Sequence, residues 1–252
     1  MNRTRADEFR GLRLRHFDPR QLAPQIEEIV GRRIYLQHGV DLKQGDTVFD
    51  VGGNVGVAAA FFAHECRAGA VHSFEPVAPL HELLRENLSQ FPACSAHNFG
   101  LAAEAGSAQI TFYPEVAVMS GLYADRERDM RQLRQAMTNL GLDDEAAEAR
   151  VAGYRGVEMT CELRTFSEVR RQLGVERVDL LKIDVERAEL DVLLGIDERD
   201  WPRIRQIVAE VHEDAYAEAI EQMLIERDYR FAWERDPVLA GTPTRLLFAT
   251  RS

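Results

Sequence analysis

The stretch Val48-Phe49-Asp50-Val51-Gly52-Gly53-Asn54-Val55-Gly56 decides the fold of this chain. An apolar run ends in an acid, a glycine-rich turn follows, and residues 57–62 have helical character. This order predicts a buried strand that passes into a helix across a turn without bulky side chains. Glycines permit positive φ and let a ligand approach the backbone, and the helix N-terminus supplies free N–H groups.

A second predicted strand, over 70–74, ends in Glu75-Pro76. In a doubly wound sheet the ends of the first two strands lie side by side, so Glu75 can reach the two hydroxyls of a ribose with both carboxylate oxygens. The two strand ends together predict a cofactor that contains a nucleoside.

The chemistry of the glycine turn narrows the choice of nucleoside cofactor. The dinucleotide fingerprint is G-x-G-x-x-G, whereas this turn reads D-x-G-x-N-x-G through Asp50, Gly52, Asn54 and Gly56. An acid at the strand end would repel a pyrophosphate, but it suits the ammonium and sulfonium of S-adenosylmethionine, and Asn54 can bind the methionine part. A nicotinamide-dependent oxidoreductase, a non-catalytic binding domain and an αβ turn whose acid only caps the helix are the alternatives.

Three motifs resemble those of FkbM-type methyltransferases: 49–56, then Phe74-Glu75-Pro76, then 181–189. The resemblance implies S-adenosylmethionine as cofactor, methylation of a hydroxyl group, and a class I, Rossmann-like fold of seven strands with an antiparallel hairpin at one edge. It also implies that Asn98 meets the adenine and that Met119-Ser120-Gly121 lines the methyl-transfer zone. The wider family usually has glycine where Arg187 stands. Arg187, together with 200–207 and 210–212, resembles the branch of the family that acts in polyketide and nonribosomal-peptide biosynthesis.

Composition excludes several classes of function. The 252 residues are 45% hydrophobic and can bury one sizeable core. A net charge of −11 argues against nucleic acid or an anionic membrane as the main partner. Three cysteines without C-x-x-C spacing indicate a reducing cytoplasm rather than a disulfide framework or a zinc site. Six arginines in the first twenty residues indicate a solvated or helical arm, with docking to an acidic carrier protein as the sharper alternative.

Hydrophobic periodicity predicts an N-terminal helical arm over 1–40 and one domain over 41–252. Strands alternate with helices, as in a doubly wound, mostly parallel sheet. Expected strands are 46–51, 70–74, 94–99, 108–113, 157–163, 178–183, 204–211, 229–234 and 245–250; expected helices are 21–37, 54–66, 79–89, 165–173, 186–194 and 216–227. The segment 122–156 interrupts the alternation with an amphipathic helix, expected to pack over the sheet or to act as a substrate lid.

Histidine and carboxylate positions suggest where the chemistry occurs. Transfer of a methyl group to a hydroxyl benefits from a base that removes the proton. Period-two alternation puts Glu210 and His212 on one face at the carboxyl end of a strand, where ligands bind in such sheets. His212 is therefore the predicted base, with a histidine that caps the next helix as the plain alternative and His38 as its main rival.

The acids near that strand end allow a second mechanism. Glu186 is expected in the first turn of a helix, facing inward to orient or charge the base, and Asp184 ends the preceding strand near the cofactor. Asp184 and Glu210 could instead hold a divalent metal, although no histidine–carboxylate spacing supports one strongly, so metal-free catalysis is preferred. The acceptor is expected to be a small molecule or a polyketide or peptide intermediate tethered to a carrier protein.

Overall fold

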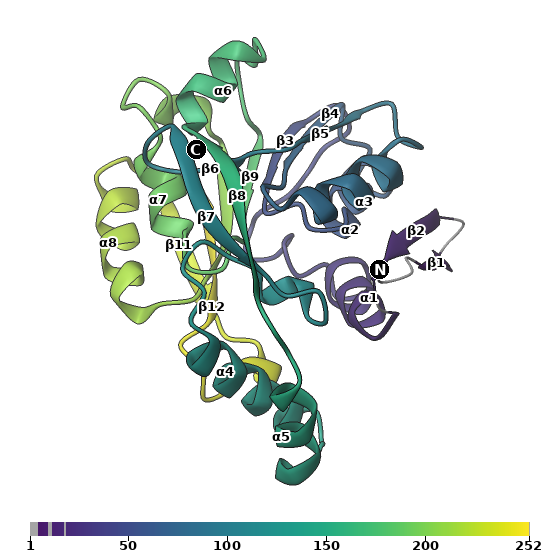
Figure 1. Cartoon of the computed structure of the whole chain (residues 1–252). Helices are drawn as coiled ribbons and strands as arrows, with labels where there is room; N and C mark the ends of the chain where they lie inside the picture. Colours follow the sequence, from purple (N-terminus) through teal and green to yellow (C-terminus); the bar gives the residue numbers. More distant parts are fainter. Residues whose placement is uncertain (1–4, 10–11, 18, 252) are drawn as a thin grey trace.

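Seven strands form one central sheet in the computed structural model, which describes residues 5–9, 12–17 and 19–251 (Figure 1). The order across the sheet is β11-β12-β10-β9-β3-β4-β5. The strands are β3 (Thr47–Val51), β4 (Ala70–Phe74), β5 (Cys94–His97), β9 (Leu180–Ile183), β10 (Gln206–Val211), β11 (Arg230–Glu234) and β12 (Arg245–Thr250). All pairs are parallel except those of β12, which runs antiparallel to β10 and β11. The predicted doubly wound sheet with a closing antiparallel hairpin is confirmed.

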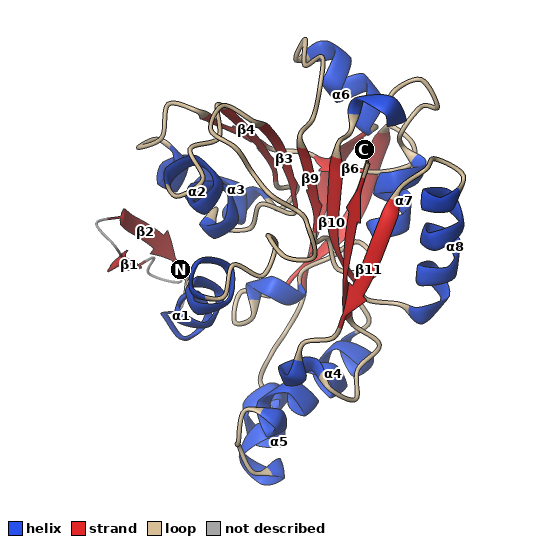
Figure 2. Ribbon diagram, turned by 180° about the vertical axis from the view of Figure 1, so that it is seen from behind, coloured by secondary structure: helices blue, strands red, loops and turns tan. Residues whose placement is uncertain are grey.

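Successive side chains of the central strands enter two separate hydrophobic clusters. Val48 and Leu180 pack with residues of α2 and α3, whereas Phe49 and Leu181 pack with residues of α6, α7 and α8. Because neighbouring side chains of a strand point to opposite faces, helices cover both sides of the sheet (Figure 2). These helices are α2 (Val57–His64), α3 (Ala78–Leu88), α6 (Phe166–Gln172), α7 (Glu189–Leu194) and α8 (Asp214–Ile225).

The register of the central strands brings their carboxyl ends to one edge. Val51 at the end of β3 lies opposite Phe74 in β4 and Ile183 in β9. The residues that follow these strands, Glu75 and Asp184 among them, therefore emerge together. A ligand site is expected at such an edge of an open α/β sheet.

A second sheet of three strands lies beside the first, in the order β6-β8-β7. Its strands are β6 (Gly100–Leu101), β7 (Gly106–Phe112) and β8 (Val157–Arg164). The strands expected over 108–113 and 157–163 are thus confirmed, and they pair antiparallel with each other. The segment between them contains residues 122–156, which are called the insertion below.

The insertion contains two helices where one was expected. α4 (Arg126–Asn139) is capped by Asp125 and α5 (Asp144–Ala152) by Asp143, and the two helices pack against each other. Gly141, at φ 94°, makes the turn between them. Side-chain caps and a left-handed glycine are strong local stop and start signals, which explains why the helix divides here.

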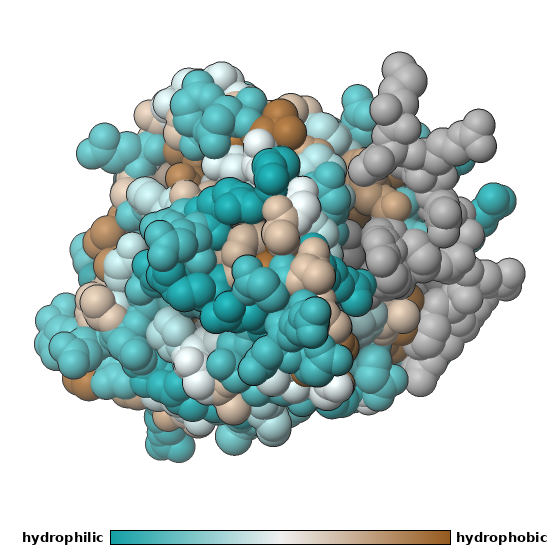
Figure 3. Space-filling model, turned by 60° about the horizontal axis from the view of Figure 1, so that its bottom comes forward, coloured by the Kyte–Doolittle hydropathy of each residue, from teal (hydrophilic) through white to brown (hydrophobic). Residues whose placement is uncertain are grey.

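The outer face of the insertion is polar. Figure 3 shows the side of the molecule that lies at the bottom of Figure 1, where α4 and α5 are found, and it is largely hydrophilic. Among the residues described, no helix is both long enough and apolar enough to cross a membrane. The apolar positions of α4 face inward: Met130 is buried, and Leu133 and Met137 line the cavity described below.

The helical arm expected over residues 1–40 is only partly helical. β1 (Arg5–Phe9) and β2 (Leu12–His16) form an antiparallel hairpin, and α1 (Pro19–Ile26) continues as a π-helix, η1 (Glu27–Gly31). The helix expected over 21–37 therefore ends six residues early, and Arg33 and His38 adopt left-handed conformations. Its apolar positions Ile29 and Ile34 are nevertheless buried: Ile29 lies in η1, and the turns that follow present Ile34 to the core as a helix would.

Candidate active site

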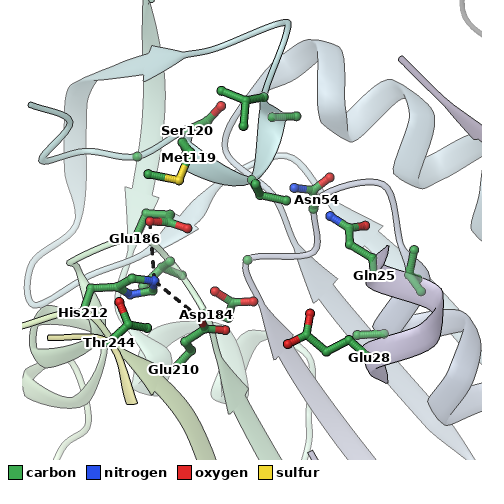
Figure 4. Close-up of a pocket in the computed structure, with 18 of the residues that line it drawn as sticks. Gln25, Glu28, Asn54, Met119, Ser120, Asp184, Glu186, Glu210, His212 and Thr244 are labelled. Carbon is green, nitrogen blue, oxygen red and sulfur yellow. Dashed lines mark ion pairs between the residues drawn. The ribbon is translucent and has the colours of Figure 1, made fainter. Parts of the chain in front are cut away.

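A cavity of about 690 Å³ opens at the carboxyl edge of the central sheet. The glycine turn after β3 and the ends of β4, β9 and β10 form one part of its lining. Other parts come from η1, the segment 115–122, α4, α5 and η4 (Pro237–Leu239), among others. Figure 4 shows side chains from the glycine turn, the strand ends and η1 pointing into it. The insertion therefore contributes to the wall of the cavity, as a substrate lid would.

The glycine turn is shaped by close backbone contacts. Gly52 and Gly53 donate their N–H groups to the carbonyl of Phe74 at 3.1 and 2.9 Å. A Cβ on Gly52, at φ 82°, would lie 1.8 Å from the backbone oxygen of Asp184, so only glycine fits. Gly56, at φ 92°, precedes α2 and packs under Leu84 without lining the cavity.

Asp50 lies beneath the cavity rather than in it. Its side chain is fully buried, accepts a hydrogen bond from Ser73 Oγ at 2.6 Å, and pairs with Lys182 Nζ at 3.1 Å. The interpretation of Asp50 as a partner for a cationic cofactor therefore needs correction, because its cation is Lys182. Burial lowers the pKa of Lys182, but Asp50 and Asp184 outweigh it and raise that pKa above its ordinary value.

Asp184, directly after β9, is the acid that faces the cavity. It accepts a hydrogen bond from the Tyr35 hydroxyl at 3.1 Å, and its carboxylate lies 3.6 Å from Lys182 Nζ. Because Lys182 is shared with the buried Asp50, Asp184 leaves a negative charge at the cavity wall. That charge suits the cationic part of a cofactor.

Glu75 is fixed in the turn after β4. Its two carboxylate oxygens accept hydrogen bonds from the backbone N–H groups of Asn54 at 2.8 Å and Val77 at 2.9 Å. Burial raises the pKa of Glu75 to about 7, although both bonds and Lys182 oppose that shift. Glu75 lines the cavity together with Asn54 and Pro76. Each carboxylate oxygen keeps a lone pair that could accept a bond from a ribose hydroxyl.

Asn98 supports this turn from outside. Its Nδ2 donates to the carbonyls of Glu75 at 2.9 Å and Pro76 at 3.4 Å, and its side chain does not line the cavity. By contrast, Met119, Ser120 and Gly121 all line the cavity, as expected for the methyl-transfer zone.

His212, directly after β10, lies at the centre of a carboxylate cluster (Figure 4). Its Nδ1 is 2.8 Å from Glu189 Oε1, and its Nε2 is 3.5 Å from Glu186 Oε2 and 3.9 Å from Glu210 Oε1. Burial lowers the pKa of His212, but the three carboxylates outweigh burial and raise it well above 6.5. His38, the rival histidine, bonds Glu234 at 2.7 Å and does not line the cavity.

The carboxylate that orients His212 is Glu189, which sequence patterns did not reveal. Glu189 is fully buried in the first turn of α7, and its Oε1 also accepts a hydrogen bond from the backbone N–H of Arg187. The sequence alone gave no signal for this pairing, because Glu189 reads as an ordinary acid near a helix N-terminus.

Glu186 reaches the cavity by another route than expected. The helix predicted from Glu186 begins three residues later, at Glu189, and Glu186 and Arg187 both adopt left-handed conformations, at φ 52° and 75°. The expectation that Glu186 occupies the first turn of a helix is therefore wrong, although its side chain does face the cavity. Burial raises the pKa of Glu186 to about 7, while His212 lowers it.

A divalent cation would find suitable ligands here. Asp184, Glu186 and His212 each offer one ligand atom, and these atoms all lie within 4.8 Å of one another. Glu210 stands beside them on β10. The sequence offered Asp184 and Glu210 as the ligands of a divalent metal. The structure adds Glu186 and His212 as candidate ligands, which sequence spacing did not bring together.

The sheet order, the glycine turn and the acids after β4 and β9 define a class I methyltransferase, an enzyme that uses S-adenosylmethionine. Residues 50–231 match the Methyltransferase FkbM domain, and the chain belongs to that family.

Relatives and a solved structure agree with this membership. The chain is 36% identical over 229 residues to the 31-O-demethyl-FK506 methyltransferase FkbM of Streptomyces tacrolimicus, covering 89% of this chain and 88% of that protein. It is 33% identical over 241 residues to the AMB antimetabolite synthetase AmbE of Pseudomonas aeruginosa, covering 89% of this chain but 11% of the synthetase. The structure of a methyltransferase FkbM from Methylobacillus flagellatus superposes with a TM-score of 0.54 at 13% identity, covering 85% of this chain and 46% of the other, which supports the fold.

Proposed function

We propose that the protein methylates a hydroxyl group, with His212 as the general base. The observation that carries the proposal is the buried pair of His212 and Glu189, which holds Nδ1 at 2.8 Å and directs Nε2 toward the cavity. A base oriented in this way by a carboxylate can take a proton from an acceptor bound at Nε2.

The residues around His212 have different roles in the proposed reaction. S-adenosylmethionine supplies the electrophilic methyl group. Asp184 offers a negative charge to the cationic end of the cofactor, and Glu75 offers lone pairs to its ribose. Gly52, which has no Cβ, lets the backbone of the glycine turn pass close to that of Asp184. The acceptor hydroxyl must then lie about 3 Å from the methyl carbon, within reach of His212.

The acceptor is proposed to be a small molecule or an intermediate tethered to a carrier protein. The relative from Streptomyces tacrolimicus is named for methylation of an oxygen of FK506, and AmbE is named as a synthetase of which this chain matches a small part. The cavity extends well beyond the glycine turn, to α4 and η4, and so offers room for an acceptor of some length.

A methyl-transfer screen tests the proposal. Hydroxylated acceptors, free and carrier-bound, are incubated with S-adenosylmethionine and analysed by mass spectrometry for the gain of one methyl group on oxygen. His212→Ala should lose about 10²–10⁴-fold in kcat with cofactor affinity retained. Near-normal turnover of His212→Ala on the true acceptor would remove the role given to His212.

Metal-assisted O-methylation is the second candidate, and the convergence of Asp184, Glu186 and His212 favours it. A cation held there could lower the pKa of the acceptor hydroxyl, and His212 would then be a ligand rather than a base. Chelator separates the two mechanisms. Loss of turnover with EDTA, restored by one divalent metal, supports the metal; unchanged turnover supports His212 as the base.

A further inference from the structure

An unpaired arginine lines the cavity at the end formed by the insertion. Arg150 lies in the last turn of α5 and contributes to the cavity wall. Its Nε has almost no accessible surface and no hydrogen-bond partner, although the residue as a whole is only half-buried. Among the described residues, the guanidinium makes no ion pair. A desolvated donor without a partner is unfavourable, and a ligand that accepts its hydrogen bond could remove this cost.

The other two cations of the cavity wall are already neutralised. Arg32 pairs with Asp236 at 2.7 Å, and Lys182 pairs with Asp50 at 3.1 Å. On α4, Arg134 pairs with Glu148, and Arg126 donates to backbone carbonyls at the end of α5. Among the described lysines and arginines of the cavity wall, Arg150 is thus the one without a carboxylate partner, in a chain with net charge −11.

The position of Arg150 is fixed by its neighbours. The next residue, Val151, is buried in a small cluster with Tyr113 and Met130. The Arg126 side chain donates to the carbonyls of Ala152 at 3.4 Å and Tyr154 at 3.3 Å, and so fastens the end of α5 to α4. The end of α5, which carries Arg150, is therefore fixed beside the cavity before any ligand binds.

Apolar side chains line the cavity near Arg150. Val116, Leu133 and Met137 belong to the same hydrophobic cluster as Val151, and all three line the cavity. An acceptor that fits has an apolar body and carries a negatively charged group where it meets Arg150. The planar guanidinium binds phosphate and carboxylate oxygens in pairs, and both groups are therefore suitable.

We infer that Arg150 binds an oxyanion of the methyl acceptor and so selects acceptors that carry one. The inference rests on the proposed function, because it concerns the acceptor of that reaction. The oxyanion is the phosphate of a phosphopantetheine arm in a carrier-tethered acceptor, or a carboxylate in a free acceptor.

Titration calorimetry on the protein saturated with S-adenosylhomocysteine tests the phosphate source. The probes are 4′-phosphopantetheine and pantetheine, which differ by the phosphate group. The native protein should bind the phosphorylated probe about ten-fold more tightly or better. Arg150→Gln should equalise the two affinities and Arg150→Lys should keep part of the difference. Arg131→Gln, which changes an exposed arginine of α4, should keep all of it.

The carboxylate source has its own pair of probes. A hydroxy acid should be methylated with a KM about ten-fold below that of its methyl ester, and Arg150→Gln should remove this preference with kcat nearly unchanged. A preference on either pair that disappears in Arg150→Gln supports the inference. Absence of both preferences, or a preference that survives in Arg150→Gln, overturns it. The calorimetric result needs no turnover, so it stands apart from the outcome for His212.

Discussion

The guanidinium of Arg187 forms a buried ion pair with the carboxylate of Asp129. Arg187 belongs to the loop that carries Glu186 into the cavity, and Asp129 belongs to α4 of the insertion, where the Tyr113 hydroxyl also donates to it at 3.3 Å. Arg187 adopts a left-handed backbone conformation, at φ 75°, which glycine adopts without steric cost. In this chain, the ion pair of Arg187 with Asp129 connects the insertion to the loop of Glu186 at the reaction centre.

Breaking this link should be costly. Asp129→Ala leaves Arg187 buried without a counter-charge, which should lower the free energy of unfolding by about 3–5 kcal/mol. Acceptor KM should rise in the same variant, because the ion pair no longer connects the loop of Glu186 to α4. Glu127→Ala, which removes an exposed ion pair on the same helix, is the control and should leave the unfolding midpoint nearly unchanged. Equal midpoints for both variants in thermal unfolding would contradict the prediction.

Cofactor affinity should depend on Glu75. Loss of a charge-assisted contact to ribose should weaken binding of S-adenosylhomocysteine by about ten- to a hundred-fold in Glu75→Ala. Because Glu75 also accepts two backbone N–H bonds, circular dichroism must show that the variant is folded. Glu82→Ala, on the exposed side of α3, serves as the control in titration calorimetry. Unchanged affinity in Glu75→Ala would end the ribose assignment.

The insertion should govern acceptor binding more than cofactor binding. Met137→Glu places a charge on the apolar wall of the cavity, which should raise acceptor KM about ten-fold or more while cofactor affinity stays within a few-fold. Steady-state kinetics and calorimetry measure the two quantities separately. If cofactor affinity collapses in a folded variant, the insertion is part of the cofactor site instead.

The pH profile should report the carboxylates around His212. Only neutral imidazole accepts a proton, and the pKa of His212 lies well above 6.5, so kcat/KM should rise with pH through a range above neutrality. Glu189→Gln removes a negative charge that favours the protonated ring, so the pKa falls and this rise should move to lower pH. The plateau rate should fall as well, because Nδ1 loses its orienting carboxylate. A profile that Glu189→Gln leaves in place would contradict the role of that residue.

The strands and the strand-end acids could be predicted from the sequence because they depend on local patterns. An apolar run and an acid at or directly after its end predict β3, β4 and β9 to within two residues, and a glycine turn marks the end of β3 as well. The partner of each acid depends on side chains that meet across the sheet. Lys182 reads as an interruption in an apolar strand, yet it is the residue that neutralises Asp50 and leaves Asp184 to the cavity.

The errors have a related cause. The helix from Glu186 was expected early because Leu190 and Leu193 continue its apolar period backwards, and periodicity does not register two left-handed residues at the start. Likewise, the turns after Gly31 bury Ile34 as a helix would, so the pattern cannot distinguish them. Ile34 and Leu193 are buried as predicted, although the backbone around them differs from the one expected.

The insertion leaves and re-enters the fold at paired positions. Phe112 at the end of β7 lies opposite Val157 at the start of β8, and the two strands continue to pair from there to Gly106 and Leu163. Because both ends of the segment are fixed by the pairing of β7 with β8, the segment can change in length or sequence without shifting the register of these two strands. Exchange of this segment between relatives is therefore a short evolutionary route to a new acceptor, and a practical boundary for building chimaeric enzymes.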